Sequence, residues 1–245
     1  MIARALIAAA GEGRRLGADV PKALADLGGV PLFVHSLLSF ERAGMLDGAV
    51  IVAPPMHAGA IQEIIGSRFP EREMTIVPGG RTRQESVWNG LSVVPADTYV
   101  IAIHDAARPF TPPAAIRASV EAAAAYGAAT VAIPSSDTIL EADENSFLNR
   151  TPDRSRLWQC QTPQSFRLDV IKAAYVNARA KDLAATDDAT LVRRNGGTVK
   201  LIDGSPYNFK ITLPEDLRLA GAMIASGVLD APGDYASGIS DRTWL

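Results

Sequence analysis

The loop after the first apolar run carries basic side chains with little opposing charge. It reads LIAAAGEGRRLGADVPKAL from Leu6 to Leu24, and its cations are Arg14, Arg15 and Lys22. Small residues and glycines let backbone amides approach a phosphate chain closely. Arg and Lys beside such a loop can neutralise the charge that develops in phosphoryl-type chemistry. The pattern favours a phosphate site over the alternative that these cations simply face solvent.

The glycine spacing of this loop argues against two common nucleotide-binding patterns. Gly17 comes one residue too late for the dinucleotide fingerprint Gly-x-Gly-x-x-Gly. The acidic residue that binds a ribose is missing, because the second expected strand ends in Pro54-Pro55. A P-loop pattern is also absent from the sequence. The spacing alone predicts only a tight turn, so the case for phosphate binding depends on the cations.

An acidic residue follows an expected buried strand in YVIAIHDAARPF, from Tyr99 to Phe110. Asp105 stands at the end of this strand, and Arg108 brings a cation nearby. Such a carboxylate can hold a divalent ion or a ligand hydroxyl, and its alternative role is to cap the following turn. We expect His104 to be a packed strand residue rather than a general base.

Two further segments place polar groups after expected strands. In PGGRTRQESVWNGL, Gly79 and Gly80 permit close backbone approach and Ser86 lies early in the next helix. This fits either a nucleobase pocket or a capped turn. In NFKITLPEDL, Lys210 precedes a good helix start, and a solvated lysine is the alternative reading.

Apolar runs alternate with longer amphipathic segments, which predicts an α/β fold with a mostly parallel sheet and helices on both faces. Ligands of such sheets bind outside the carboxyl ends of the strands. The expected strands are Ala3–Ala8, Ala49–Ala53, Met74–Val77, Tyr99–His104, Ala129–Ile133 and Thr198–Ile202. The expected helices are Leu32–Ala43, His57–Ser67, Thr82–Val93, Pro113–Tyr126 and Leu168–Ala180.

The polar segment Ser135–Gln164 breaks this alternation. We expect it to form a long β-hairpin arm that projects from the core. Long insertions in compact domains are usually functional or disordered. This one has Leu140, Phe147, Leu157 and Trp158 to bury, so we expect it to pack on something such as a second subunit.

Composition and charge limit the class of protein. The 245 residues are 47% hydrophobic and 21% charged, which is ordinary for a globular protein. We expect one domain over residues 1–228, with the arm inside it, and a weakly ordered Gly/Ser/Asp-rich tail over 229–245. The net charge of −3 gives no reason to expect a nucleic-acid or anionic-membrane partner.

Cysteine use and the amino terminus predict a cytoplasmic location. Cys160 is the one cysteine, so no internal disulfide can form, and no Cys/His spacing resembles a zinc site. The opening MIARALIAAAGEG lacks a convincing cleavage region and is too short to span a bilayer.

Taken together, the motifs resemble one family. Ala-Ala-Gly-x-Gly-x-Arg, Pro-Lys, Gly-Gly-x-x-Arg-x-x-Ser-Val, His-Asp-Ala-Ala-Arg-Pro, Thr-Pro-Gln, Thr-Asp-Asp and Phe-Lys-Ile-Thr-x-Pro-Glu-Asp occur in this order. From about Ile7 to Ala220, the chain resembles the 2-C-methyl-D-erythritol 4-phosphate cytidylyltransferases of the non-mevalonate isoprenoid pathway. Each motif is modest alone, but their order is specific.

The resemblance implies a Rossmann-like nucleotidyltransferase fold whose projecting arm embraces a partner in a homodimer. The implied reaction joins CTP and methylerythritol phosphate, with Mg²⁺, to give the CDP-linked alcohol and pyrophosphate. The substrate phosphate would attack the α-phosphorus of CTP, so the site needs positioning and positive charge rather than a general base.

The resemblance also implies roles for residues of this chain. Arg15 and Lys22 match cations on the triphosphate, and Arg154 and Lys210 match residues that position the methylerythritol phosphate. Thr138 and Arg154, both on the arm, would reach into the neighbour's active site. The other implied members of the substrate pocket are Asp105, Arg108, Thr138, Thr162 and Thr186, with Asp105 also a weak metal candidate. The implied nucleotide-binding residues are Ala9, Ala10, Gly11, Gly13, Gly80 and Ser86.

Three alternatives stay open at this point. The nearest is a cytidylyltransferase for another polyol phosphate, such as ribitol 5-phosphate. A second is a nucleotide-binding regulator that has lost catalysis, against which the retention of Arg15, Lys22, Arg154 and Lys210 argues. A Rossmann dehydrogenase comes third, because this chain lacks the acidic residue with which such enzymes bind a ribose.

Overall fold

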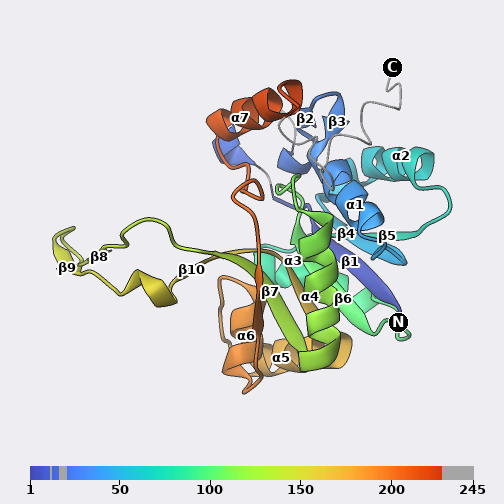
Figure 1. The fold of residues 1–245 in the computed structure, drawn as a ribbon. Coiled ribbons are helices and arrows are strands. Elements are labelled where there is room, and N and C mark those ends of the chain that lie inside the picture. The colour runs from blue at the N-terminus through green and yellow to red at the C-terminus, as the bar shows by residue number, and fades with distance from the viewer. Residues whose placement is uncertain (12, 17–20, 228–245) are drawn as a thin grey trace.

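A seven-stranded sheet forms the centre of the molecule, with the strand order β11-β7-β10-β6-β1-β4-β5 (Figure 1). The computed structural model describes residues 1–11, 13–16 and 21–227, so the predicted tail over 229–245 lies outside the described residues. The strands of this sheet are β1 (Ala3–Ala8), β4 (Gly48–Ala53), β5 (Glu73–Pro78), β6 (Val100–Asp105), β7 (Ala128–Pro134), β10 (Trp158–Arg167) and β11 (Lys200–Asp203).

Strand pairing in this sheet is parallel except at β10. β1 pairs in parallel with both β4 and β6, so that Ile7 lies opposite Ile51 on one side and His104 on the other. β10 runs antiparallel to both of its neighbours, β6 and β7. The predicted mostly parallel α/β sheet is confirmed.

Helices cover both faces of the sheet, as the alternating pattern predicts. Along β1, Ala5 and Ile7 face the cluster that includes α1, α2 and α4, whereas Leu6 faces the cluster that includes α3, α5 and α6. Both faces of β1 are buried, which explains why its sequence is apolar throughout. The helices are α1 (Leu32–Arg42), α2 (Ala58–Arg68), α3 (Arg83–Val93), α4 (Pro113–Tyr126), α5 (Leu168–Ala180), α6 (Asp188–Arg194) and α7 (Pro214–Ala225).

A smaller apolar cluster lies at one end of the sheet, where α7 sits beside the hairpin of β2 (Asp26–Leu27) and β3 (Val30–Pro31) (Figure 1). Leu27, Leu32, Ile211 and Met223 are among its buried members. This cluster fastens the chain after Lys210 to the chain after Lys22, two segments that are far apart in the sequence. Four 3-10 turns complete the described elements: η1 (Arg14–Leu16), η2 (Lys22–Leu24), η3 (Pro55–His57) and η4 (Arg154–Arg156).

The projecting arm is shorter than the sequence predicts. Residues 158–164 belong to β10, a strand of the main sheet, rather than to the arm. The part that extends away from the sheet carries the short strands β8 (Glu141–Ala142) and β9 (Leu148–Arg150) (Figure 1). Thr138 and Leu157 lie outside the strands, and β10 begins directly after Leu157.

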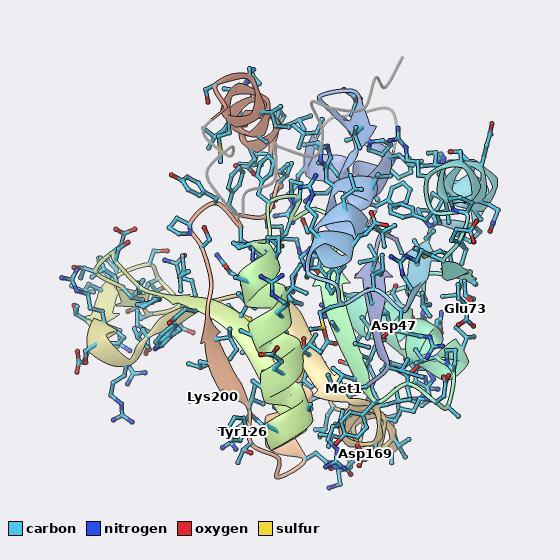
Figure 2. The ribbon with its side chains drawn as sticks, turned by 45° about the vertical axis from the view of Figure 1, so that its right-hand side comes forward. Met1, Asp47, Glu73, Tyr126, Asp169 and Lys200 are labelled. Carbon is cyan, nitrogen blue, oxygen red and sulfur yellow. The ribbon has the colours of Figure 1, made fainter. Side chains whose placement is uncertain are left out.

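The two ends of the sheet differ in character. Met1, Asp47, Glu73 and Lys200 precede or begin parallel strands, and all four lie below α7 in Figure 2, with Met1 and Lys200 in the lower part of the view. The carboxyl ends of β1 and β6 lie at the opposite end of the sheet. They lead into the loops after Ala8 and Asp105, where ligands of such sheets bind. None of the described helices is both long and apolar enough to cross a membrane.

Candidate active site

A cleft of about 520 Å³ lies at the carboxyl ends of β1 and β6. Its walls come from the loop after β1, the start of α3, the loop after β6 and the segment between β11 and α7. Its lining residues are Ala8, Ala9, Ala10, Gly11, Gly13, Arg15, Lys22, Ala23, Gly80, Arg81, Thr82, Arg83, Ser86, Asp105, Ala106, Ala107, Lys210 and Thr212. Ten of the fifteen predicted site residues are among them.

The cleft gathers cations from distant parts of the sequence. Arg15 lies in η1, Lys22 opens η2, and Lys210 comes from the segment before α7, yet all three line the same space. Gly13 has a φ of +69°, and a Cβ on it would lie 2.8 Å from the Cβ of Lys22. A side chain at position 13 would therefore displace Lys22, which explains the glycine in physical terms.

The surroundings of Lys22 disfavour the charged, protonated form of its side chain. Its pKa is lowered to about 8, first by burial and then by the positive charge of Lys210, with Arg15 acting in the same direction. Asp105 and Asp216 partly counter this effect. An ammonium group in such a place is poised to bind an anion, because an added negative charge would relieve the repulsion.

Asp105 pairs with two of the cations that line the cleft. Its Oδ2 accepts a hydrogen bond from Lys210 Nζ at 2.7 Å, and its Oδ1 accepts one from Arg83 Nε at 3.3 Å. Although burial raises the pKa of this carboxyl, Arg83 and Lys210 outweigh burial and hold the pKa well below its usual range. Asp105 is thus a permanent anion that orients two cations.

Arg83 is a cleft residue that sequence reasoning did not single out. Besides Asp105, its guanidinium contacts Asp188 Oδ2 at 2.9 Å, and Tyr175 donates a hydrogen bond to Asp188 Oδ1 at 2.6 Å. These charges raise the pKa of Arg83 despite its burial. The arginine of Gly-Gly-x-x-Arg was a visible signal, but its partners lie in other segments of the chain.

Small residues shape the other wall of the cleft. A Cβ on Gly79 would lie 2.3 Å from the Cβ of Ala10, so the methyl group of Ala10 packs directly against the Gly79 backbone and leaves no room for a side chain there. The Gly80 amide donates to Ser86 Oγ at 2.9 Å, and Thr82 caps α3 by accepting from the Glu85 amide at 3.0 Å. The predicted capped turn is confirmed, and the predicted nucleobase pocket at this loop stays a prediction.

The remaining predicted residues do not line this cleft. Thr162 is buried beneath it, where its hydroxyl accepts from the Asp105 amide at 3.1 Å and pairs with His104 Nδ1 at 2.9 Å. Arg108 donates to the carbonyls of Asn208 and Cys160. The others, Thr138, Arg154 and Thr186, are exposed.

His104 is a packed strand residue, as the sequence predicts. It is fully buried, and burial lowers its pKa to about 4, so the imidazole is neutral at physiological pH. Its Nε2 lies 3.1 Å from the Arg108 carbonyl, and Phe40 packs edge-on against its ring. A general-base role would need an approach from the cleft that this packing does not provide.

Asn208 is a second residue that sequence reasoning missed. Its buried amide donates to Gln161 Oε1 at 3.1 Å and to the Thr162 carbonyl at 2.9 Å, and its Oδ1 accepts from Thr111 at 2.8 Å. These bonds fix the segment that carries Lys210. No local pattern reveals them, because every partner is distant in the sequence.

Comparisons with known proteins agree with this geometry. The family model of 2-C-methyl-D-erythritol 4-phosphate cytidylyltransferase matches residues 3–226. The chain is 45% identical to the protein of that name from Pelotomaculum thermopropionicum, over 90% of this chain and 93% of the relative. It is 42% identical to that from Syntrophotalea carbinolica, over 94% of this chain and 97% of the relative.

Solved structures give the same result at the level of the fold. The 4-diphosphocytidyl-2C-methyl-D-erythritol synthase of Anaerococcus prevotii is 27% identical with a TM-score of 0.81, over 91% of this chain and 98% of that one. The cytidylyltransferase of Thermus thermophilus is 33% identical with a TM-score of 0.73, over the same shares. With its cleft, its fold and these relatives in agreement, the chain belongs to the 2-C-methyl-D-erythritol 4-phosphate cytidylyltransferase family.

Proposed function

We propose that the protein transfers the cytidylyl group of CTP to 2-C-methyl-D-erythritol 4-phosphate, giving 4-diphosphocytidyl-2-C-methyl-D-erythritol and pyrophosphate in isoprenoid precursor biosynthesis. The observation that carries this proposal is the gathering of Arg15, Lys22 and Lys210 in one cleft, beside a wall of small residues. A triphosphate would meet positive charge on one side and close backbone approach on the other.

The chemistry asks for charge and alignment. A phosphate oxygen of the acceptor forms a bond to the α-phosphorus of CTP, while the bond from that phosphorus to the β-phosphate oxygen breaks and pyrophosphate leaves with the electron pair. The attacking oxygen is already anionic, so no side chain needs to remove a proton. Arg15 and Lys22 would stabilise the crowded negative charge, and Lys210, held by Asp105, would orient the acceptor phosphate.

Magnesium fits this cleft as an ion that arrives with the nucleotide. The described residues hold no group of three His, Cys, Asp or Glu that could bind a metal. Asp105 is the acidic residue that lines the described cleft, and both of its oxygens are engaged by Arg83 and Lys210. Mg²⁺ commonly takes one or two carboxylates plus substrate phosphates, and when bound it would add positive charge there.

The arm supports a homodimer in which each chain completes the other's site. Leu140, Phe147 and Leu148 are 62%, 72% and 63% exposed, so the arm presents large apolar side chains of the kind that mark interaction surfaces. Arg154 and Thr138 lie on this same arm, outside the cleft of their own chain. A partner chain seated on the arm would cover these apolar groups. Arg154 would then reach the cleft of that partner chain. We further propose a cytoplasmic location, as the sequence predicts.

Pyrophosphate release tests the proposed reaction directly. The enzyme would be given Mg²⁺ and CTP, with methylerythritol 4-phosphate and ribitol 5-phosphate offered in parallel. Release with the first acceptor alone is expected. Release with ribitol 5-phosphate alone would keep the chemistry and change the pathway. Binding of CTP without release from either acceptor would move the protein to the class of inactive nucleotide-binding regulators.

The lowered pKa of Lys22 predicts an alkaline limit to nucleotide capture. The cationic form binds the triphosphate, so kcat/KM for CTP should fall as the pH rises through about 8. The Lys22→Arg variant keeps its charge at every working pH and should lose this limb, even if it is slower overall. A profile for the parent that stays flat up to pH 10 would contradict the assignment.

Arg154→Ala is expected to raise KM for the polyol phosphate about tenfold or more while KM for CTP changes less than twofold. The reason is that Arg154 lies on the arm, away from the residues that line the nucleotide cleft. Steady-state kinetics with each substrate varied in turn would measure the split. Equal weakening of both constants would contradict this division of labour.

Mixing the Arg154→Ala and Lys22→Ala variants, assayed at an acceptor concentration well below the KM of Arg154→Ala, tests whether Arg154 acts across the dimer. In a dimer of one Arg154→Ala chain and one Lys22→Ala chain, one site would combine an intact cleft with an intact arm. Random exchange at equal amounts should therefore restore about a quarter of the parent activity. If Arg154 serves the cleft of its own chain, mixing will restore nothing.

A further inference from the structure

The first turn of α3 connects the cleft to a second segment of the chain that lies outside the cleft. Thr82, Arg83 and Ser86 line the wall next to the small-residue loop. The same turn also reaches the segment over residues 183–188, which carries Thr186 and leads into α6. The two regions are about a hundred residues apart in the sequence, so the contacts between them are tertiary ties.

Gln84 makes two of these ties. Its Nε2 donates to the Leu183 carbonyl at 3.0 Å, and its Oε1 accepts from the Ala185 amide at 3.1 Å. One side-chain amide thus pairs with the backbone on both sides of Ala184, as a neighbouring strand would. These two hydrogen bonds fix both the position and the direction of the segment over residues 183–188.

Arg83 provides a second tie at the other end of the segment. Its guanidinium contacts Asp188 at 2.9 Å and also holds Asp105. The buried Gln164 secures the same place from below, since its Oε1 accepts from the amides of Asp188 and Ala189. Thr186 therefore lies between two anchored points, Ala185 and Asp188, while its own side chain is exposed.

We infer that Gln84 is a positioning residue that holds the Thr186 segment in register with the nucleotide end of α3. This inference rests on the proposed function and on the resemblance, which implies that Thr186 belongs to the substrate pocket, while α3 begins at the cleft that would hold the nucleotide. Gln84 touches neither substrate in this scheme. It acts by keeping the two subsites at one fixed separation, on which in-line attack depends.

Gln84→Ala removes both hydrogen bonds and leaves Arg83 in place. We expect KM for the polyol phosphate to rise about tenfold and KM for CTP to change less than twofold, since misplacement of a reacting group is costly. Gln84→Glu keeps an acceptor for the Ala185 amide but loses the donor to Leu183, so its effect should be smaller. Asn177→Ala serves as the matched control, because Asn177 makes an exposed amide tie from α5 to Asn195 and none to α3.

Hydrogen exchange on the free protein separates this inference from the proposed function. The Ala185 amide should exchange faster in Gln84→Ala than in the parent or in Asn177→Ala. Unchanged exchange would overturn the tie itself, and faster exchange with equal changes in both KM values would overturn the positioning role. A parent enzyme that releases no pyrophosphate would refute the proposed function, and the exchange result would then still decide whether Gln84 holds the segment.

Discussion

Lys22→Ala is expected to lower kcat on the order of 10²-fold or more, because the variant loses a cation aimed at charge that develops in the transition state. Lys22 lines the cleft together with Arg15 and Lys210, and Asp105 is the carboxylate that raises its pKa most. The loss should appear in steady-state pyrophosphate release with both substrates saturating. A rate near that of the parent would remove Lys22 from the mechanism.

The same variant should not unfold more easily than the parent. The folded-state pKa of Lys22 is lowered from 10.5 to about 8, so the fold disfavours its charged form. Below about pH 8 this charge costs stability, and the cost is relieved as the pH rises from about 8 to 10.5. Removing the ammonium at pH 7 should therefore leave the melting temperature unchanged or higher.

Two controls make the result specific. Lys22→Arg keeps a positive charge and should retain more activity than Lys22→Ala, although its broader guanidinium must fit the cleft beside Arg15 and Lys210. Lys181→Ala removes an exposed lysine at the end of α5 and should change neither rate nor stability. A drop in melting temperature for Lys22→Ala, together with lost activity, would point to a structural role instead.

The sequence predicted the parts of the fold that its apolar pattern controls. The bounds of β1, α4 and α5 are as expected, because each is a clear apolar or amphipathic run with a sharp end. Asp105, Lys22 and Lys210 were found for a related reason. Asp105 directly follows an apolar run at the sheet edge where ligands bind, Lys22 lies in the glycine-containing loop that leaves the first apolar run, and Lys210 precedes a clear helix start.

β10 was missed because its core positions are polar. In the run WQCQTPQSFR, residues Gln161, Thr162, Gln164 and Ser165 are all buried. Each has a partner: Gln164 bonds the start of α6, and Ser165 pairs with Ser119 at 2.9 Å. A polar strand can occupy the interior when its groups are satisfied, but only the tertiary structure supplies the partners.

The charge network of the site was hidden for the same reason. Arg83 is the arginine of the Gly-Gly-x-x-Arg motif, but the motif does not show that its guanidinium pairs with both Asp105 and Asp188. Local spacing can place a residue at the correct edge of the sheet, but it cannot pair that residue with another segment. Gln84 and Asn208 follow the same rule, since all of their partners come from other elements.

Asp105→Asn is expected to reduce kcat on the order of 10²-fold while KM for CTP stays level or falls. The amide would be nearly the same size, so the cleft keeps its shape. Lys210 loses the carboxylate that accepts its hydrogen bond at 2.7 Å and is no longer aimed at the acceptor phosphate. The cleft also becomes more positive, which favours a triphosphate in the ground state without aligning the attack.

The substitution should also cost stability in a pH-dependent way. Loss of this carboxylate is expected to lower the free energy of unfolding by about 2 to 3 kcal/mol. This value is small for the loss of one partner of a buried ion pair, because the side chains of Lys210 and Arg83 are partly exposed. The pKa of Asp105 is depressed in the folded state, so its stabilisation is present above its ordinary value of about 4 and is lost as the pH falls through the folded-state pKa. The gap between parent and variant in urea unfolding should therefore be constant above about pH 5 and narrow below about pH 4.

A third readout joins this variant to Lys22. The negative charge of Asp105 raises the pKa of Lys22, so its removal should shift the alkaline limb of kcat/KM for CTP to a lower pH than in the parent. Glu215→Gln is the matched control, because it breaks an exposed ion pair with Arg218 outside the cleft and should move none of the three measurements. If Asp105→Asn leaves the limb in place and raises KM for CTP in step with the fall in kcat, Asp105 binds the nucleotide directly and does not act by orienting Lys210.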